Sequence, residues 1–117
     1  MKRGEIWTLA GGPDYAGKPR PVVIIQSDEF EAIASITFCP FTTNDTTAPL
    51  FRIPVAATED NGLRSPSSLM VDKIATVPRV RLGKRIGRID DDDLLRLNHA
   101  ILVFLGLTSP LTRVARE

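Results

Sequence analysis

The residue with the clearest chemical potential is Arg20, which stands between two prolines directly before a run of apolar residues. Pro19 and Pro21 each fix their own φ, and Pro21 also restricts the backbone of Arg20 to extended conformations. A guanidinium carries five N–H donors in a planar fork that matches a phosphate group, and Lys18 adds a second cation nearby. The pattern predicts a phosphate-binding arginine; a solvated arginine at the start of a strand would have the same local sequence.

Two further polar clusters lie at the ends of predicted strands. Thr42 and Thr43 offer hydroxyl groups, while Asp72 and Lys73 offer a carboxylate and an ammonium group. Strand ends on the same side of a small sheet converge, so we expect these side chains to meet Arg20 in one cleft. A cation, a hydroxyl and a carboxylate held together in this way can bind and polarise a phosphate group.

The other chemistry-bearing residues are better explained by structure. Cys39 is the only cysteine, which excludes an intramolecular disulfide and a cysteine-based zinc site, and its apolar neighbours predict a buried, inert thiol. His99 falls on the polar side of the last predicted helix, as a surface histidine, and Asp90 to Asp93 precede that helix as N-terminal caps. The sequence shows no metal-ligand cluster, P-loop or dinucleotide fingerprint, so we expect no metal and no cofactor.

The hydropathy pattern predicts a small β domain followed by a helix. Alternating or continuous apolar residues predict strands at residues 5–9, 21–26, 35–39, 51–55, 68–71, 73–77 and 84–89, with Pro54 marking an edge or bulged strand. From Leu94 to Leu105 apolar residues recur at helical spacing, and Gly106 follows. This order predicts a mainly β fold, a strongly curved sheet or barrel that is covered at one end by a C-terminal helix.

Length and composition predict one domain, residues 1–117, in the cytoplasm. The N-terminus has no signal-peptide apolar stretch, and no segment reaches about 18 apolar residues, so we expect no membrane association. The 15 Lys and Arg residues and the 14 Asp and Glu residues give a net charge of +1. An anion-binding site therefore has to be local.

Four sequence blocks together resemble a known family. They are Arg3-Gly4-Glu5-Ile6-Trp7, then Lys18-Pro19-Arg20-Pro21-Val22-Val23-Ile24-Ile25-Gln26, then Pro40-Phe41-Thr42-Thr43, and finally Asp72-Lys73-Ile74-Ala75-Thr76-Val77 before the predicted helix. In this order and spacing, from residue 3 to about residue 105, they resemble the MazF/PemK toxins, which are endoribonucleases of type II toxin-antitoxin systems.

The resemblance implies an SH3-like, partly open barrel that works as a homodimer and cuts single-stranded RNA at short sequence motifs without metal. The family's catalytic arginine falls on Arg20 and its catalytic threonine on Thr42, with Thr43 as the alternative. The acid that some members use as a general base falls on Asp72. The arginine that those members carry two residues earlier is replaced here by Met70, so the resemblance does not identify the leaving-group acid.

The residues support the same reaction on chemical grounds. Metal-free RNA cleavage deprotonates a 2′-hydroxyl, stabilises negative charge on a phosphorane and protonates the 5′-oxygen. Asp72 would be the base if desolvation raises its pKa, Arg20 would stabilise the phosphorane, and Thr42 would bind a non-bridging oxygen. Because a guanidinium keeps its proton near neutral pH, Lys73 or a water would supply the final proton. Substrate binding is assigned to Lys18, Thr43 and Lys73.

Two other functions fit a small barrel. Toxins of a similar fold bind DNA gyrase without being enzymes, but that family depends on a tryptophan close to the C-terminus, and the only tryptophan here is Trp7. A non-catalytic RNA-binding barrel would keep a basic stretch at residues 79–88 but would need neither Arg20 nor Thr42. That stretch holds Arg79, Arg81, Lys84, Arg85 and Arg88. We interpret it as a solvated face or a dimer contact, with direct RNA contact as the alternative.

The resemblance also implies partners. Besides single-stranded RNA, we expect a cognate antitoxin whose acidic, disordered tail folds over the cleft and pairs with Arg20 and Lys18. We also expect a second copy of the chain in a homodimer, and operator DNA only as part of the toxin-antitoxin complex. The loops expected to read bases, residues 11–18 and 56–65, carry no readable code for the RNA motif.

Overall fold

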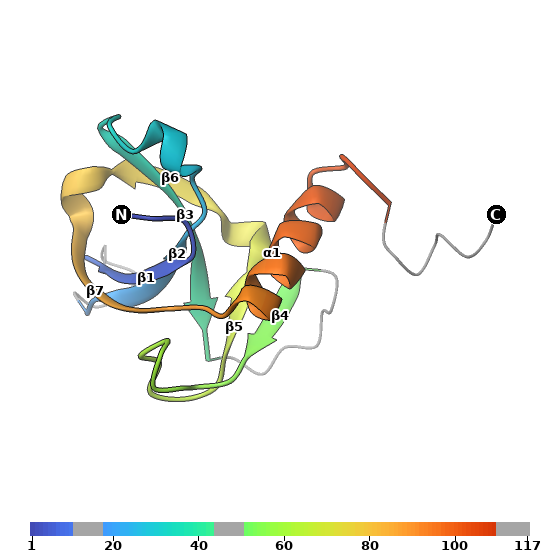
Figure 1. The fold of residues 1–117 in the computed structure, drawn as a ribbon, viewed down its shortest axis with the longest axis horizontal. Coiled ribbons are helices and arrows are strands. Elements are labelled where there is room, and N and C mark those ends of the chain that lie inside the picture. The colour runs from blue at the N-terminus through green and yellow to red at the C-terminus, as the bar shows by residue number, and fades with distance from the viewer. Residues whose placement is uncertain (11–17, 44–50, 110–117) are drawn as a thin grey trace.

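Seven antiparallel strands form one curved sheet, which is followed by a helix (Figure 1). The computed structural model describes residues 1–10, 18–43 and 51–109. In chain order the elements are β1 (Glu5–Leu9), β2 (Arg20–Ile24), η2 (Asp28–Phe30), β3 (Ser35–Thr42), β4 (Arg52–Val55), β5 (Ser67–Met70), η3 (Val71–Lys73), β6 (Ala75–Pro78), η4 (Arg79–Arg81), β7 (Leu82–Arg88) and α1 (Asp91–Phe104). Neighbouring strands follow the order β4-β5-β3-β2-β1-β7, and β6 pairs with β3. The sheet does not close, which confirms the predicted partly open barrel with a C-terminal helix.

The long strand β3 joins the two parts of the sheet. Its first half, residues 35–38, pairs with β6, and its last two residues, Phe41 and Thr42, pair with β5. The sequence predicted that this strand would end at Cys39. It continues for three more residues because β5 supplies a partner for them. Thr42 is therefore held by sheet pairing and does not belong to the loop.

The main core lies between the sheet and α1. Ile6 of β1, Val23 of β2, Leu69 of β5 and Leu97 of α1 are each completely buried in one apolar cluster. Burying a side chain of this size stabilises the fold by roughly 1.5–3 kcal/mol. The cluster thus holds the helix against one face of the β4-β5 pair and leaves the other face for polar side chains.

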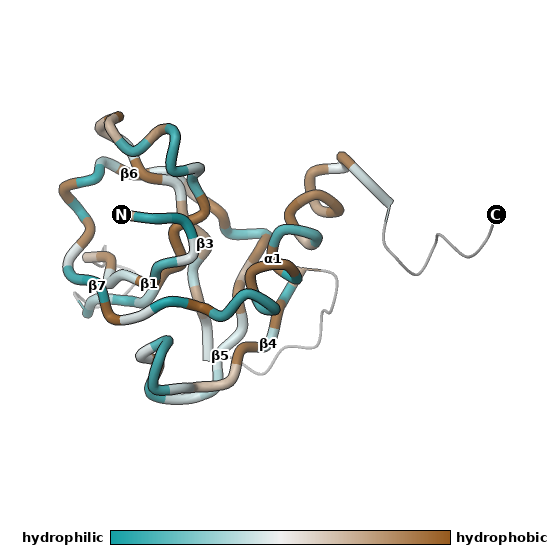
Figure 2. Tube along the Cα trace, viewed as in Figure 1, coloured by the Kyte–Doolittle hydropathy of each residue, from teal (hydrophilic) through white to brown (hydrophobic). Residues whose placement is uncertain are grey.

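The helix is capped and anchored by polar side chains. The Asp90 carboxylate accepts the backbone N–H of Asp93 at 2.8 Å, which confirms the predicted N-terminal cap. Hydrophobic and hydrophilic residues alternate along α1 (Figure 2), and Arg96 donates to the carbonyl of Pro54 at 2.7 Å, which ties the helix to β4. His99 is half-buried instead of lying on the surface, because the buried stripe of the helix is wider than its leucine and isoleucine residues indicate. No helix in the described part of the chain is long and apolar enough to cross a membrane.

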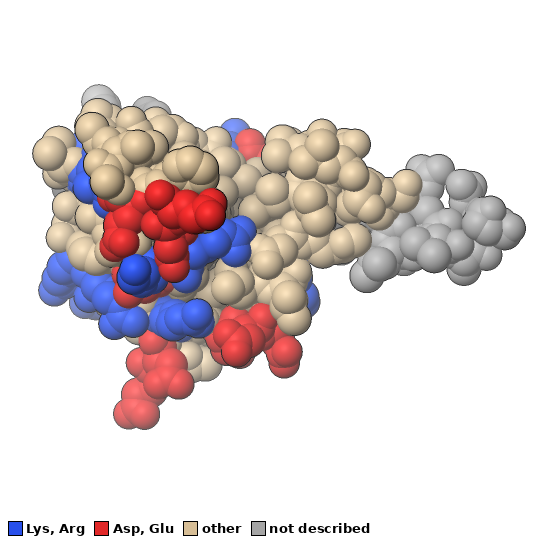
Figure 3. All heavy atoms as spheres, turned by 45° about the horizontal axis from the view of Figure 1, so that its top comes forward, with Lys and Arg blue, Asp and Glu red and all other residues tan. Residues whose placement is uncertain are grey.

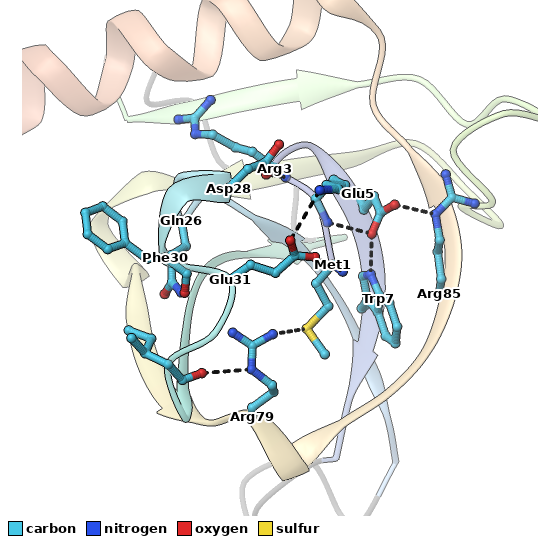
Figure 4. A network of polar contacts seen from close by, with 12 residues as sticks. Met1, Arg3, Glu5, Trp7, Gln26, Asp28, Phe30, Glu31, Arg79 and Arg85 are labelled. Carbon is cyan, nitrogen blue, oxygen red and sulfur yellow. Dashed lines mark hydrogen bonds and ion pairs between the residues drawn. The ribbon is translucent and has the colours of Figure 1, made fainter.

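Arg3 (Figure 4) and Gly4 of the first sequence block fix the chain before β1. The backbone N–H of Arg3 donates to Asp28 Oδ1 at 2.7 Å, and its Nε donates to the carbonyl of Ile25 at 2.7 Å. Gly4 has a φ of 92°, which favours glycine, and its N–H donates to the carbonyl of Ile24 at 2.8 Å. These contacts set the register in which β1 enters the sheet.

Glu5 of the same block is enclosed by donors (Figure 4). Its carboxylate accepts the backbone N–H of Lys2 at 2.9 Å and the indole N–H of Trp7 at 3.0 Å, and it pairs with Arg85 at 3.1 Å. Burial alone would raise the pKa of Glu5, but these three donors outweigh it and lower the pKa. The block that carries the family resemblance most clearly therefore serves the fold.

The segment after β5 differs from the predicted strand at residues 73–77. Asp72 and Lys73 belong to the single turn η3, and β6 begins only at Ala75. The turn forms because Val71 is buried in the core, while its backbone N–H donates to the carbonyl of Phe51 at 3.0 Å. This turn carries the Asp72 side chain away from the strand ladder.

Candidate active site

Arg20 and Thr42 come from two neighbouring strands. Arg20 is the first residue of β2, Thr42 is the last residue of β3, and these strands pair with Val22 opposite Pro40. Continuing this antiparallel register by two residues places Arg20 opposite Thr42, and residues opposite each other project from the same face. Arg20 is exposed and Thr42 is half-buried. The sheet therefore brings a cation and a hydroxyl to adjacent positions at one end, as the sequence predicted.

Asp72 occupies a different position and has an arginine partner. Arg52, the first residue of β4, donates through Nε to Asp72 Oδ1 at 3.0 Å and through Nη2 to Asp72 Oδ2 at 3.2 Å. The side chains of Arg52 and Asp72 are 15% and 22% exposed, so the pair lies at the surface but is largely enclosed. Phe51 supports it, because its ring centroid lies 5.6 Å from the guanidinium carbon.

The sheet register relates this pair to the strand-end residues. In β4 and β5, Arg52 lies opposite Met70, and Ser68, two residues before Met70, lies opposite Thr42. Side chains alternate between the two faces along a strand, so the side chains of these residues project from the sheet face opposite to the one on which Leu69 is buried. The backbone of Arg52 is separated from that of Thr42 by two strand spacings across the sheet, about 10 Å, and by two residues along the strands, about 7 Å. The carboxylate thus belongs to the same face as the strand-end residues but not to the same point.

The pKa of Asp72 moves in the direction opposite to the one that the role of a base requires. The hydrogen bonds from Arg52 lower it and outweigh the opposing effect of burial, and the charges of Arg52 and Lys73 lower it further. A general base works best when its pKa lies near the working pH. The predicted condition for Asp72 as a base, a pKa raised by desolvation, is therefore not met.

Arg52 is the residue that the sequence reasoning missed. It stands in the alternating strand pattern as a polar residue between the apolar residues Phe51 and Ile53, which made it resemble an ordinary solvated position. The sequence nevertheless contained a signal: position 70 is Met70, so Asp72 lacks a basic partner two residues before it and has to find one elsewhere. The guanidinium comes from the neighbouring strand, directly opposite Met70.

The three predicted substrate-binding side chains are exposed: Lys18 before β2, Thr43 after β3 and Lys73 in η3. Lys18 and Thr43 lie next to Arg20 and Thr42 in the chain, at the same end of the sheet. The predicted base-reading loop at residues 11–18 falls outside the described residues except for Lys18. The second predicted loop, residues 56–65, leaves β4 at this end and is tied to β7 by the bond from the Arg88 N–H to the Asp60 carbonyl, 3.0 Å.

The basic stretch at residues 79–88 mostly serves the protein itself. Arg79 donates to the carbonyl of Ile33, Arg81 to that of Ala10 and Arg88 to that of Ile89, while Arg85 pairs with Glu5. On the face drawn in Figure 3, groups of acidic and basic side chains lie next to each other and form no continuous basic surface. These contacts favour the predicted solvated, structural interpretation over direct RNA contact.

Two other features support structural interpretations. Cys39 is fully buried, which confirms the predicted burial, and burial together with the Asp72 carboxylate raises the pKa of its thiol to about 12. A hollow of about 720 Å³ between residues 58–61 and residues 85–91 contains none of the candidate site residues. The Asn61 side chain in this hollow holds the loop together: its Oδ1 accepts the backbone N–H groups of Thr58 and Leu63, and its Nδ2 donates to the carbonyl of Ala56. Among the described residues, no three or more His, Cys, Asp or Glu side chains are placed to hold a metal ion.

Comparison with known proteins gives a consistent picture. A family model of the PemK-like, MazF-like toxins of type II toxin-antitoxin systems matches residues 2–105. A probable endoribonuclease MazF of Mycolicibacterium smegmatis is 54% identical over 107 residues, 92% of this chain and 98% of that protein. The endoribonuclease MazF9 of Mycobacterium tuberculosis is 30% identical over 93% of this chain and 99% of its own length. The solved structure of the Mycobacterium tuberculosis toxin MazF-mt6 is 28% identical, with a TM-score of 0.76 over 89% of this chain and 98% of that one.

Proposed function

The chain belongs to the PemK-like, MazF-like toxins of type II toxin-antitoxin systems, and we propose that it is an endoribonuclease that cuts single-stranded RNA by attack of the 2′-hydroxyl on the adjacent phosphate. Its similarity to two endoribonucleases over more than nine-tenths of its length supports this activity. The observation that carries the proposal is the sheet register that sets Arg20 beside Thr42 at one end of β2 and β3.

The chemistry follows from these two side chains. As the 2′-hydroxyl gives its proton to a water, the 2′-oxygen bonds to phosphorus and the bond to the 5′-oxygen breaks, and negative charge accumulates on the non-bridging oxygens. The Arg20 guanidinium stabilises this charge and Thr42 donates a hydrogen bond to one of the oxygens. Lys73 or a water protonates the departing 5′-oxygen. The products are a 2′,3′-cyclic phosphate and a 5′-hydroxyl, and the reaction needs no metal.

Asp72 remains part of the proposed site with a revised role. Its pKa is lowered by Arg52, and the register places this partner two strands from Thr42, so we assign Asp72 to positioning Arg52 and not to proton abstraction. Lys18, Thr43 and Lys73 bind the substrate, because their exposed polar groups flank the proposed catalytic residues in the chain.

The test is cleavage of a long RNA by the purified protein in the presence of a chelator, followed by mapping of both ends of the products. We expect a 2′,3′-cyclic phosphate, a 5′-hydroxyl and a recurring short motif at the cut. A matched RNA with one 2′-deoxyribose just 5′ of the cut should not be cleaved there. Loss of activity in chelator, or normal cleavage of the deoxy substrate, would contradict this mechanism. RNA binding without any cleavage would favour the non-catalytic RNA-binding barrel.

The proposed partners are an antitoxin and a second copy of the chain. One similar solved structure, with a TM-score of 0.77 and 22% identity, is an endoribonuclease in complex with its cognate antitoxin. We propose that an acidic antitoxin tail pairs with Arg20 and Lys18, and that operator DNA is bound only by such a complex. An antitoxin peptide that binds the Arg20→Ala variant as tightly as the wild type would show that inhibition does not use this site.

The proposed homodimer has a physical reason in the apolar surface at the end of the helix. Leu102, Phe104, Leu105 and Leu107 are between 42% and 69% exposed. A second copy would cover such a surface and lengthen an RNA groove. Light scattering should show a dimer at micromolar concentration, and a monomer would contradict this proposal. We place the protein in the cytoplasm, together with its RNA substrate.

A further inference from the structure

A second arginine faces the same side of the sheet as the proposed catalytic residues. Arg52 is held at its Nε and one Nη2 proton by Asp72 and is supported by the Phe51 ring. A guanidinium has five N–H donors, so three of them, including the edge that joins the two Nη atoms, are not used by this pair. Within the described part of the chain, Asp72 is the only acceptor bonded to Arg52.

The remaining donors suit one kind of ligand. A guanidinium edge with two parallel N–H groups matches a phosphate, and the fixed pair limits the rotamers that Arg52 can adopt. Phe51 in turn contacts Phe104 of α1, with ring centroids 6.3 Å apart, so the support of Arg52 extends into the core. A side chain fixed in this way loses little conformational freedom when it binds a ligand.

The contrasting pair at Glu5 shows why this arrangement is unusual. Arg85 is 49% exposed, and its partner Glu5 is satisfied by the Trp7 indole and the Lys2 amide as well. Asp72 instead has its two carboxylate oxygens bonded by one guanidinium. In the first pair the arginine is one of several donors that stabilise the Glu5 carboxylate, whereas in the second pair the Asp72 carboxylate orients the arginine.

We propose that Arg52 binds a backbone phosphate of the RNA that flanks the cut, and that Asp72 and Phe51 act as positioning residues for it. This inference rests on the proposed function, since it names a contact of the same RNA. The separation of Arg52 from Thr42, about 10 Å across and about 7 Å along the sheet, assigns Arg52 to a neighbouring nucleotide and not to the phosphate at Arg20.

The experiment measures binding of an RNA that carries the blocking 2′-deoxyribose, at several salt concentrations. The informative variant is the double substitution Arg52→Met with Asp72→Asn, because it removes one positive and one negative charge and leaves the net charge at +1. We expect roughly 10- to 100-fold weaker binding and a salt slope that is smaller by about 0.7, the value for one phosphate contact on a single strand. The matched control is Arg85→Met with Glu5→Gln, which should leave the slope unchanged.

The single variants separate the roles of the two residues. Arg52→Lys should keep the salt slope and lose affinity, because an ammonium retains the charge but not the fork. Asp72→Asn should weaken binding less than the double variant and leave the low-pH side of the cleavage-rate profile unchanged. If Asp72→Asn removes that pH dependence, Asp72 is the general base and the positioning role is wrong. If the wild type cleaves RNA and the double variant binds it with the affinity and salt slope of the wild type, only this inference fails. If the wild type does not cleave RNA, the proposed function fails as well.

Discussion

Two carboxylate-arginine pairs in this molecule have similar geometry and different surroundings. Glu5 and Asp72 each pair with an arginine at about 3 Å, each is largely enclosed, and each has a lowered pKa. Glu5 is bonded by three separate groups around β1, in a network that continues to the N-terminus (Figure 4). Asp72 has both carboxylate oxygens bonded by the Arg52 guanidinium, and its own backbone N–H is a further donor. Glu5 is thus fixed by groups from three other residues, whereas Asp72 is fixed by one other residue, Arg52; this difference is the reason why we propose a role in RNA binding for the second pair only.

After Arg20, Thr42 is expected to give the largest effect on the proposed site without touching the Glu5 network. Thr42→Ala should lower the cleavage rate roughly 10²-fold, because it removes one preorganised donor to the phosphorane. The matched control is Thr37→Ala on the same strand, which loses a 2.6 Å contact with Thr76 but lies far from the cut. Single-turnover cleavage of both variants checks this. Equal rates for the two variants would remove Thr42 from the proposed chemistry.

Glu5 should show the opposite behaviour. Glu5→Ala leaves the Trp7 indole N–H and the Lys2 amide without their acceptor, so the free energy of unfolding should fall by about 1–3 kcal/mol. The cleavage rate of the folded fraction should not change. Urea denaturation gives the stability and cleavage at low temperature gives the rate. A variant that loses activity while its stability is unchanged would place Glu5 in the active site.

Both pairs predict a loss of stability in acid. A carboxylate whose pKa is lowered by folding stabilises the protein above its unfolded pKa, and this contribution disappears as the pH falls through the folded pKa. The ordinary pKa values are 4.5 for Glu5 and 3.8 for Asp72, so the free energy of unfolding should begin to fall below about pH 4.5. Denaturation measured at several pH values should show that the free energy of unfolding of Glu5→Gln and of Asp72→Asn each falls less steeply with decreasing pH than that of the wild type. A variant with the wild-type slope would show that its carboxylate is not stabilised by folding.

His99 should give the smallest effect. It is half-buried on α1 and belongs to neither pair, so His99→Ala should lower the free energy of unfolding by about 0.5–1 kcal/mol and leave cleavage unchanged. Thermal denaturation and the same cleavage assay test this. A lower cleavage rate at unchanged stability would contradict the view that this histidine takes no part in the reaction.

The sequence predicted the features that depend on local patterns. Strand alternation and helical spacing predicted the mainly β fold and α1, and the four sequence blocks predicted the family. The prolines around Arg20 and the polar residues Thr42 and Thr43 after a predicted strand were enough to place Arg20 and Thr42 at one end of the sheet, since antiparallel neighbours share a register.

The features that the sequence did not reveal depend on contacts between distant segments. Arg52 and Asp72 are twenty residues apart, and only the β4-β5 register brings them together. The direction of the Asp72 pKa shift depends on that partner, so the sequence could not show whether the condition for Asp72 as a base is met. The turn at η3 was missed for a similar reason, because it follows from the burial of Val71 and not from the local sequence.

The central claim is that Arg20 stabilises the reacting phosphate at the end of β2, and its most direct test is single-turnover cleavage by Arg20→Ala beside the wild type in chelator. The account predicts a rate that is lower by roughly 10² to 10³ with an unchanged melting temperature, because Arg20 is exposed and outside the core. The control, Lys84→Ala, removes an exposed cation of β7 and should cleave at the wild-type rate. An Arg20→Ala protein that cleaves as fast as this control would contradict the account.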